Sequence, residues 1–378
     1  MIQPKFFYQT LKEYGIDFYT GVPDSLLKNL CAFITDNAEP RHHIIAANEG
    51  GAMGLAAGHY LATGQIPVVY MQNSGLGNTV NPLLSLTDKE VYNIPVLLVV
   101  GWRGEPGVHD EPQHVKQGKV TIPLLDTMGI KNEVLTADES ELQKQIERAA
   151  NYMKETKESF ALVVCKGTFD KYELKDQENP AARKLTLERE DAIKMVAASM
   201  DKKAVVVSTT GKISRELFEY REAVGEGHAR DFLTVGSMGH ASQIALGIAL
   251  SQPERPVYCF DGDGAMIMHM GSMGIVGEMA PGNYYHIIFN NGAHDSVGGQ
   301  PTIGFMLDLP EIASSCGYKT VISVENRVDL EEVLAQLTDC ETPLLLEIKV
   351  RKGARADLGR PTTTPIENKN ALINFLKE

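Results

Sequence analysis

The sequence has no apolar run that approaches the roughly 20 residues needed to cross a membrane as a helix. Its five cysteines are scattered without a C-x-x-C pair, which argues against metal ligation and disulfides and favours a reducing compartment. Positive charge is scarce: Lys and Arg number 36 against 49 for Asp and Glu, and the net charge of −13 argues against nucleic acid and acidic membranes as partners. The N-terminal stretch MIQPKFFYQTLKEYG lacks signal-peptide and transit-peptide character, so we expect a cytoplasmic protein.

What the sequence does contain is a long alternation of short apolar runs and helical patterns. At 378 residues and 43% hydrophobic content, the chain can form two domains of ordinary size. The alternation predicts an α/β fold with two doubly wound parallel sheets. Polar residues interrupt it near the middle, so we divide the chain into a domain at 1–168, a linker at 169–186 and a domain at 187–378. Strands are expected at 17–20, 43–47, 67–71, 95–100, 160–165, 204–207, 256–260, 284–289, 319–323 and 344–350.

The most informative stretch is 256–291. An apolar strand ends at the sequence DGDG, which includes Asp263; a helix of roughly four turns is expected next, and a second apolar strand ends at Asn290 and Asn291. Because ligands sit beyond the carboxyl ends of strands in a doubly wound sheet, both polar clusters are expected at one rim. A carboxylate and an amide there suit a hard cation such as Mg²⁺, which is usually held together with ligand phosphates. Two unrelated turns, DG and NG, are the alternative.

Polar residues also follow predicted strands in the first half. Glu49 opens ANEGGAMGLAAGHYLATG, whose small residues predict a closely packed helix; a helix-capping glutamate is the alternative. Asp24 or Ser25 is expected to cap a helix of 3.6-residue period. Asn73 lies in the glycine-rich turn QNSGLGN, where cofactor contact and a plain strand-to-helix turn are equal alternatives.

A long loop is predicted at 101–119, and such loops in compact α/β domains are often functional. It holds Arg103, His109 and His114, which we expect to contact substrate or transfer protons, with a solvated loop as the alternative. The histidines are five positions apart around a proline, which does not suit metal ligation from a helix.

Two further segments are candidates for anion binding. The run STTGK places Thr210 and Gly211 before a predicted helix, where they can form an anion cradle. The C-terminal VRKGARADLGRPTTTP is the clearly cationic stretch, and its Arg355 and Arg360 suit a phosphonate or sulfonate head group. A solvated tail is the alternative for the second segment.

The motif GDG followed by NN, with Asp263 and Asn291 28 positions apart, closely resembles the signature of thiamine diphosphate-dependent enzymes. The segment opened by Glu49 is similar to that family's glutamate segment. The resemblance implies a pyrimidine-binding domain, a diphosphate-binding domain and no middle domain. It implies Mg²⁺ on Asp263, Asn291 and the Ala293 carbonyl oxygen, and Glu49 at the aminopyrimidine of the cofactor. The further cofactor contacts expected are Asn73, Thr210, Gly211, Gly236, Ser237, Met238, Gly262, Gly264 and Ala265.

Within that family, TGVPDSLLK, RGEPGVHDEPQHVKQGK and NNGAHDSVGGQPT are most similar to the decarboxylases of phosphonopyruvate. The resemblance implies a carboxy-lyase of phosphonate biosynthesis that converts 3-phosphonopyruvate, a small anionic 2-oxo acid, to phosphonoacetaldehyde and CO₂. Sulfopyruvate or another 2-oxo acid, or carboligation of the acetolactate-synthase type, is the alternative. The resemblance also implies proton transfer by Asp24, His109 and His294, and active sites at the interfaces of a self-associated protein.

A different class, a phosphatase with Asp261 as nucleophile, is disfavoured because Ala265 and Met266 stand where a hydroxyl-bearing residue is needed.

Overall fold

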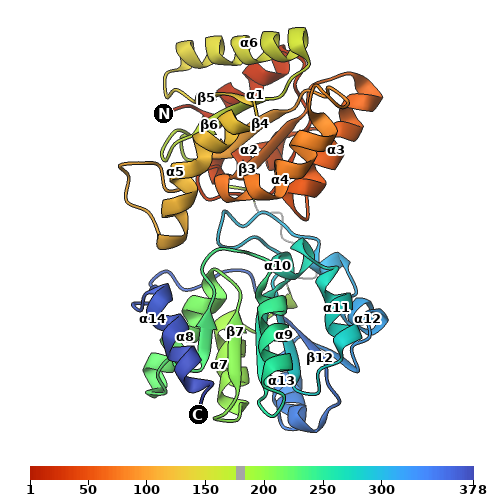
Figure 1. Ribbon diagram of the computed structural model, residues 1–378, viewed down its shortest axis with the longest axis vertical. Coiled ribbons are helices and arrows are strands. Elements are labelled where there is room, and N and C mark those ends of the chain that lie inside the picture. The colour runs from red at the N-terminus through yellow and green to blue at the C-terminus, as the bar shows by residue number, and fades with distance from the viewer. Residues whose placement is uncertain (176–183) are drawn as a thin grey trace. The chain divides into compact units, whose positions relative to one another are not determined.

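The computed structural model describes residues 1–175 and 184–378, so part of the expected linker lies outside the described residues. The chain divides into two compact units, 1–177 with 297–300 and 178–296 with 301–378. Each unit has one six-stranded parallel sheet with helices on both faces (Figure 1). The prediction of two doubly wound parallel domains without a middle domain is confirmed.

The sheet of the first unit has the strand order β2-β1-β3-β4-β6-β5. Its strands are β1 (Tyr19–Gly21), β2 (His43–Ile45), β3 (Val68–Gln72), β4 (Leu97–Gly101), β5 (Lys131–Val134) and β6 (Phe160–Val164). Its helices are α1 (Pro4–Glu13), α2 (Lys28–Asn37), α3 (Glu49–Thr63), α4 (Leu76–Pro82), α5 (Pro112–Thr127) and α6 (Glu139–Thr156). The order reverses between β1 and β3, which is where doubly wound sheets bind ligands.

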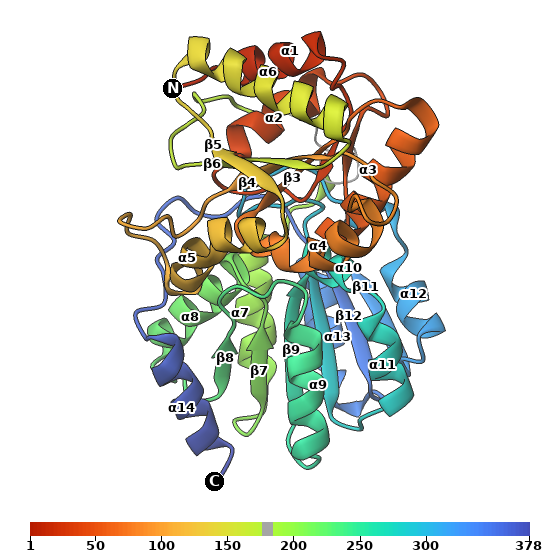
Figure 2. The ribbon, with the colours of Figure 1, turned by 45° about the horizontal axis from the view of Figure 1, so that its top comes forward.

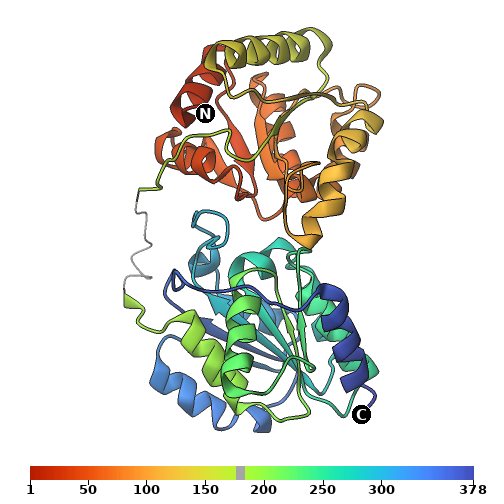
Figure 3. The same ribbon diagram turned by 90° about the vertical axis from the view of Figure 1, so that its left-hand side faces the viewer.

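Alternate side chains of the central strands β3, β4 and β6 enter two separate cores. Val68 and Tyr70 of β3 pack with α1, α2 and α6, while Val69 and Met71 pack with α3 and α5. Figure 3 shows α1 and α2 (red) and α5 (orange) on opposite sides of this sheet. Burial on both faces explains why these strands are continuous apolar runs.

The sheet of the second unit has the strand order β11-β12-β10-β9-β7-β8, which reverses between β7 and β9. Its strands are β7 (Val205–Ser208), β8 (Asp231–Leu233), β9 (Val257–Gly262), β10 (Tyr284–Asn290), β11 (Thr320–Val324) and β12 (Leu344–Lys349). Its helices are α7 (Arg189–Ser199), α8 (Lys212–Val224), α9 (Ala241–Ser251), α10 (Asp263–Met268), α11 (Ser272–Met279), α12 (Leu309–Ser315), α13 (Arg327–Leu334) and α14 (Pro365–Phe375).

The edge of this sheet at β8 is joined to α14, a helix that the sequence patterns did not predict (Figure 2). The Asn368 side chain accepts from Leu233 N at 3.0 Å and donates to Asp231 O at 2.8 Å. These two bonds pair backbone groups of an edge strand, which otherwise remain open to other chains. Across the described residues, no helix combines the length and the apolar character needed to cross a membrane.

The prediction of a loop over 101–119 is wrong for the second half of this segment, because α5 begins at Pro112. Proline is favoured in the first turn of a helix, but Pro112 and Gly118 are also residues typical of a loop. Gly118 is needed for packing: a Cβ there would lie 1.6 Å from Gly104 O. His114 is therefore a helical residue, while His109 stays in the loop.

Two other local predictions are also corrected. Asp24 does not cap a helix: α2 begins later, at Lys28, and the Asp24 carboxylate accepts from Leu26 N within the preceding turn at 2.9 Å. The single helix expected after the DGDG sequence is two short helices, α10 and α11, which are interrupted at 269–271. β5 is a further element that the patterns did not identify.

Candidate active site

Glu49 is the first residue of α3, where it is 6% exposed. The Asn48 side chain caps this helix by accepting from Gly51 N at 2.8 Å. Asn78 Nδ2 donates to Glu49 Oε2 at 2.7 Å. On the other side, a Cβ at Gly75 would lie 2.4 Å from Glu49 Oε1. The carboxyl group is thus held between an amide donor and a glycine, so its orientation is fixed by this unit alone.

Asp24 follows β1 at the point where the strand order reverses, and it is fully buried. Gln72 Nε2 donates to Asp24 Oδ1 at 2.7 Å, from the end of β3. Gly101, at the end of β4, leaves room for the carboxyl group, because a Cβ there would lie 2.2 Å from Asp24 Oδ2. Burial raises the pKa of Asp24, while the Gln72 hydrogen bond opposes that shift. A carboxyl group of this kind is suited to holding and releasing a proton.

Arg103, expected to contact substrate, makes a two-pronged ion pair with Asp110. Its Nε and Nη2 lie 2.7 Å and 2.5 Å from the two carboxylate oxygens, and Nη1 donates to Ser25 Oγ at 2.7 Å. The guanidinium holds the pKa of Asp110 down to about 2. Most of the Arg103 charge is therefore compensated within the chain, and this geometry favours a role in fixing the loop beside Asp24.

Asn73 uses its side chain to join three segments. Nδ2 donates to Arg103 O at 2.8 Å and to Thr121 Oγ1 at 2.9 Å, while Oδ1 accepts from Arg103 N at 3.2 Å. These bonds account for both Nδ2 hydrogens, so they support the turn-stabilising alternative; contact with a cofactor stays a prediction.

The two histidines of this region differ in environment. His109 is exposed in the loop. His114 is 7% exposed on α5, and burial, together with the charge of Arg103, lowers the pKa of His114 to about 4. His114 is accordingly neutral at physiological pH. It can offer a hydrogen bond to an anionic substrate but no cationic charge.

In the second unit, Asp263 and Asn291 lie at the carboxyl ends of the neighbouring strands β9 and β10, and both are buried. Asn291 Oδ1 accepts from Ala293 N at 3.0 Å, and the Thr302 hydroxyl donates to Asp263. A Cβ at Gly304 would lie 2.5 Å from Asp263 Oδ2. Burial raises the pKa of Asp263 to about 6.

These residues fit the expected cation. Within the described part of the chain, no lysine, arginine or histidine forms an ion pair with Asp263. A buried carboxylate without a cationic partner is unfavourable unless a cation binds. Carboxylate, amide and carbonyl oxygens are hard ligands that suit Mg²⁺. Asp263, Asn291 and the Ala293 carbonyl would hold it.

Asn290, the first asparagine of the pair, has a different role from Asn291. Its Nδ2 donates to Glu347 Oε1 at 2.7 Å and to Gly304 O at 3.0 Å, while its Oδ1 accepts from Gly292 N at 3.1 Å. Asn290 therefore fixes the turn that carries Asn291.

The predicted cofactor residues after β7 and β8 lie close together. Thr210 Oγ1 accepts from Gly236 N at 3.1 Å. Gly211 has φ +106°, and a Cβ there would lie 2.9 Å from Ser296 Oγ. Ser237 adopts a positive φ of 46°, and the Met238 side chain is half-buried. Gly262 ends β9, and Gly264 and Ala265 lie in the first turn of α10.

His294 and the glycine-rich loop that contains it, 292–301, follow Asn291 directly. A Cβ at Gly264 would lie 3.1 Å from the His294 ring, and burial lowers the pKa of His294 to about 4. The base of the loop is closed by a bridge between Ala293 and Pro301. The ring is therefore neutral, and it lies beside the first turn of α10.

This loop is anchored by Asp295. Its Oδ2 lies 3.0 Å from Arg189 Nη1 and 3.5 Å from Lys212 Nζ. Arg189 is itself buried and pairs with both carboxylate oxygens of Glu216 at 2.8 Å. Although burial opposes the shift, Lys212 and Arg189 lower the pKa of Asp295. Arg189 and Lys212 thus hold the loop through their ion pairs with Asp295.

The two arginines proposed for the substrate head group lie in the C-terminal segment. Arg355 pairs with Glu190 at 2.9 Å, with Asp357 at 3.1 Å and with Glu219. Arg360 is exposed. Three carboxylates compensate Arg355, so the contacts favour a role in fastening the segment to α7 and α8.

Sequence reasoning did not identify Asn78, Gly75 and Gln72. Asn78 and Gly75 lie in the same glycine-rich turn as Asn73, but nothing in their spacing shows that they face Glu49. That information comes from the packing of α4 against α3.

Comparison with known proteins relates each of the two units to a cofactor-binding family. Residues 4–127 match the family "Thiamine pyrophosphate enzyme, N-terminal TPP binding domain", and residues 209–348 match the corresponding C-terminal TPP binding domain. Phosphonopyruvate decarboxylase of Streptomyces viridochromogenes is 34% identical over 365 residues, which are 93% of this chain and 89% of the relative.

Sulfopyruvate decarboxylases are also similar. The protein of Methanosarcina acetivorans is 29% identical over 338 residues, with 84% of each chain covered. In Methanocaldococcus jannaschii the similarity is to two proteins: the beta subunit, 39% identical over 35% of this chain and 68% of its own length, and the alpha subunit, 36% identical over 39% of this chain and 83% of its own length.

The chain therefore belongs to the thiamine diphosphate-dependent enzymes. Within them it is a carboxy-lyase, a 2-oxoacid decarboxylase that uses thiamine diphosphate.

Proposed function

We propose that the substrate is 3-phosphonopyruvate and that the products are phosphonoacetaldehyde and CO₂. The observation that carries this proposal is the 34% identity to phosphonopyruvate decarboxylase over nearly the whole chain, against 29% for a sulfopyruvate decarboxylase. When bound, the cofactor supplies the electron sink that decarboxylation of a 2-oxo acid requires.

The residues of the chain divide the remaining work. Asp263 and Asn291, with the Ala293 carbonyl, would hold Mg²⁺, which neutralises the diphosphate of such a cofactor. Glu49 would hydrogen bond to the aminopyrimidine, from the orientation in which Asn78 Nδ2 holds its carboxyl group at 2.7 Å. Asp24 supplies a proton to the reacting centre, because burial favours its protonated form.

We rank the remaining candidates for proton transfer and for substrate binding by the contacts that they make. His294 lies next to the first turn of α10, so we place it nearest to the reaction. His109 is exposed, so we rank it after His294. Carboxylates compensate the charges of Arg103 and Arg355. We therefore expect hydrogen bonds to contribute more than these two arginines to binding of the substrate's phosphonate group.

Self-association with active sites at subunit interfaces is part of the proposal. The outer face of α3, the helix that Glu49 begins, exposes Leu55 (39%) and Leu61 (73%). Apolar side chains on the helix of a predicted catalytic residue favour a protein partner there. The separately named subunits of the sulfopyruvate decarboxylase of Methanocaldococcus jannaschii support assembly in this family.

The test is a substrate panel. The purified protein is loaded with thiamine diphosphate and Mg²⁺, and CO₂ release is measured with phosphonopyruvate, sulfopyruvate and pyruvate at equal concentrations. We expect the highest kcat/KM with phosphonopyruvate. A higher kcat/KM with sulfopyruvate would refute phosphonopyruvate as the substrate. It would favour sulfopyruvate decarboxylation, the second candidate function, which the 29% identical relative supports.

A further inference from the structure

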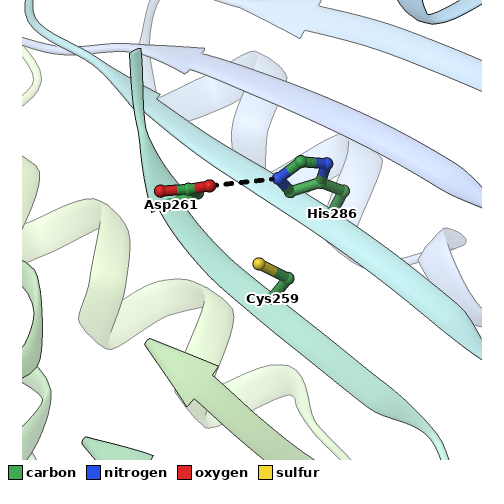
Figure 4. A group of neighbouring side chains, drawn as sticks. All are labelled: Cys259, Asp261 and His286. Carbon is green, nitrogen blue, oxygen red and sulfur yellow. Dashed lines mark ion pairs between the residues drawn. The ribbon is translucent and has the colours of Figure 1, made fainter. Parts of the chain in front are cut away.

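Two buried polar side chains face each other across neighbouring strands of the second sheet. Asp261 of β9 and His286 of β10 have no measurable exposure, and Asp261 Oδ2 lies 3.6 Å from His286 Nε2 (Figure 4). Among the described residues, neither atom has a hydrogen-bond partner. They lie on the face of the sheet that packs apolar residues of α9, α11 and α12.

The other polar atom of each side chain, Asp261 Oδ1 and His286 Nδ1, has a hydrogen-bond partner. Asp261 Oδ1 accepts from Gly262 N at 3.0 Å, and His286 Nδ1 lies 3.0 Å from the Tyr318 hydroxyl. Asp261 stands two positions before Asp263, and His286 stands five before Asn291. The pair therefore links the two strands whose ends carry the predicted metal ligands, and it contacts the backbone of the turn that carries one of them.

We propose that Asp261 and His286 are positioning residues that hold the carboxyl ends of β9 and β10 in the arrangement that binds the metal and the cofactor diphosphate. The inference rests on the proposed metal site, and it adds two residues that do not touch the cofactor. A polar side chain buried without a partner is unfavourable, so the contact between Asp261 and His286 favours the arrangement of the two strands in which these side chains face each other. Groups that orient metal ligands from behind typically change metal affinity ~10–100-fold when removed.

Cys259 lies beside the pair, and one ligand atom of each of the three residues lies within 4.8 Å of the others (Figure 4). This set has the donor types of a zinc site. A positioning role is favoured over metal binding because each side chain already has another contact. Asp261 Oδ1 accepts from Gly262 N in the turn, and His286 Nδ1 contacts the Tyr318 hydroxyl. In addition, burial keeps the pKa of the Cys259 thiol well above its usual value, so it is not a ready thiolate ligand. Cys259 therefore serves as the matched control: it is in the same cluster but has no bond to the turn.

The experiment compares His286→Leu, His286→Gln and Asp261→Asn with the Cys259→Ala control. Calorimetry gives the dissociation constants of thiamine diphosphate at saturating Mg²⁺ and of Mg²⁺ at saturating cofactor. Thermal unfolding of the cofactor-free proteins checks that each is folded. We expect His286→Leu to raise both constants by about tenfold or more. His286→Gln, which keeps a donor, should recover most of the affinity, and kcat at saturating cofactor should change little.

A double variant sharpens the result. Because Asp261→Asn/His286→Leu no longer buries an unpaired carboxylate, it should bind the cofactor better than His286→Leu alone. If His286→Leu does not fold, Asp261→Asn and His286→Gln carry the comparison. Lower melting temperatures with unchanged dissociation constants would show a purely structural role and overturn the proposal.

Two outcomes separate this inference from others. Retention of one equivalent of zinc, lost in Cys259→Ala, would show a metal site and overturn positioning by the pair. A wild-type protein that binds the cofactor and Mg²⁺ but decarboxylates no 2-oxo acid would refute the proposed function and leave this inference intact. A wild-type protein that binds neither would refute both.

Discussion

Gly75→Ala is a small substitution that tests the role of Glu49 from outside the carboxylate itself. Gly75 has φ −70° and ψ −17°, a conformation that alanine adopts without strain, so its backbone does not require glycine. The added Cβ would lie 2.4 Å from Glu49 Oε1 and 2.7 Å from its Cγ and Cδ. The three atoms nearest to the added methyl group all belong to the glutamate, so its position is what the substitution perturbs most directly.

The size of the effect follows from these distances. Ordinary contact begins near 3.4 Å, so the carboxyl group must move by about 1 Å. Such a shift breaks the 2.7 Å hydrogen bond from Asn78, which for a charged acceptor contributes about 1.5–3 kcal/mol. Overpacking costs about 1–3 kcal/mol of stability. A misplacement of about 1 Å can lower the rate about 100-fold.

The assay is CO₂ release at saturating cofactor, with the dissociation constant of the cofactor measured in parallel. We expect kcat to fall about 100-fold, while cofactor affinity falls far less, because the residues that we propose for the diphosphate all lie in the second unit. Gly77→Ala is the control: it lies two positions away in α4, and its Cβ meets nothing within 4 Å. Equal kcat values for the Gly75 variant and the Gly77 variant would refute the assigned role of the glutamate.

The remaining predictions concern other parts of the site. Asp263→Asn should weaken Mg²⁺ and cofactor binding together by more than about tenfold; calorimetry that finds unchanged affinity would remove this residue from the metal site. His114 has a folded pKa of about 4 against an ordinary 6.5. Because the unfolded chain binds the extra proton first, stability falls as pH drops from 6.5 to 4, by up to about 3 kcal/mol from this residue. His114→Gln should therefore flatten the pH dependence of unfolding relative to wild type, and parallel curves would contradict the burial argument. Asp295→Asn removes the carboxylate that Arg189 and Lys212 hold, so amides of 292–300 should exchange faster with deuterium; unchanged exchange would show that other contacts hold the loop.

The fold class was predictable because buried parallel strands are apolar on both faces and therefore visible in the sequence. Asp263 and Asn291 were predictable as neighbours for the same reason, since both follow such strands. The start of α5 was missed because Pro112 and Gly118 are residues typical of a loop, although Gly118 lets the helix approach Gly104. β5 was missed because its residues are polar and partly exposed at a sheet edge.

The site was only partly predictable, because orientation comes from contacts between distant segments. Glu49 is visible as a polar residue at a strand-to-helix turn, but its partner Asn78 is identified only by packing between helices. Arg355 illustrates the opposite error: a basic residue in a basic segment suggests anion binding. The folded chain instead surrounds it with Glu190, Glu219 and Asp357.

The central claim is that Glu49 activates a cofactor that the second unit holds through Mg²⁺. The most direct measurement is exchange of the C2 proton of bound thiamine diphosphate for deuterium, followed by NMR in wild type and Glu49→Gln at equal cofactor occupancy. We expect fast exchange in the wild type and exchange slowed by at least about 100-fold in the variant, with Mg²⁺-dependent binding retained. Equal exchange rates in the two proteins would contradict the central claim.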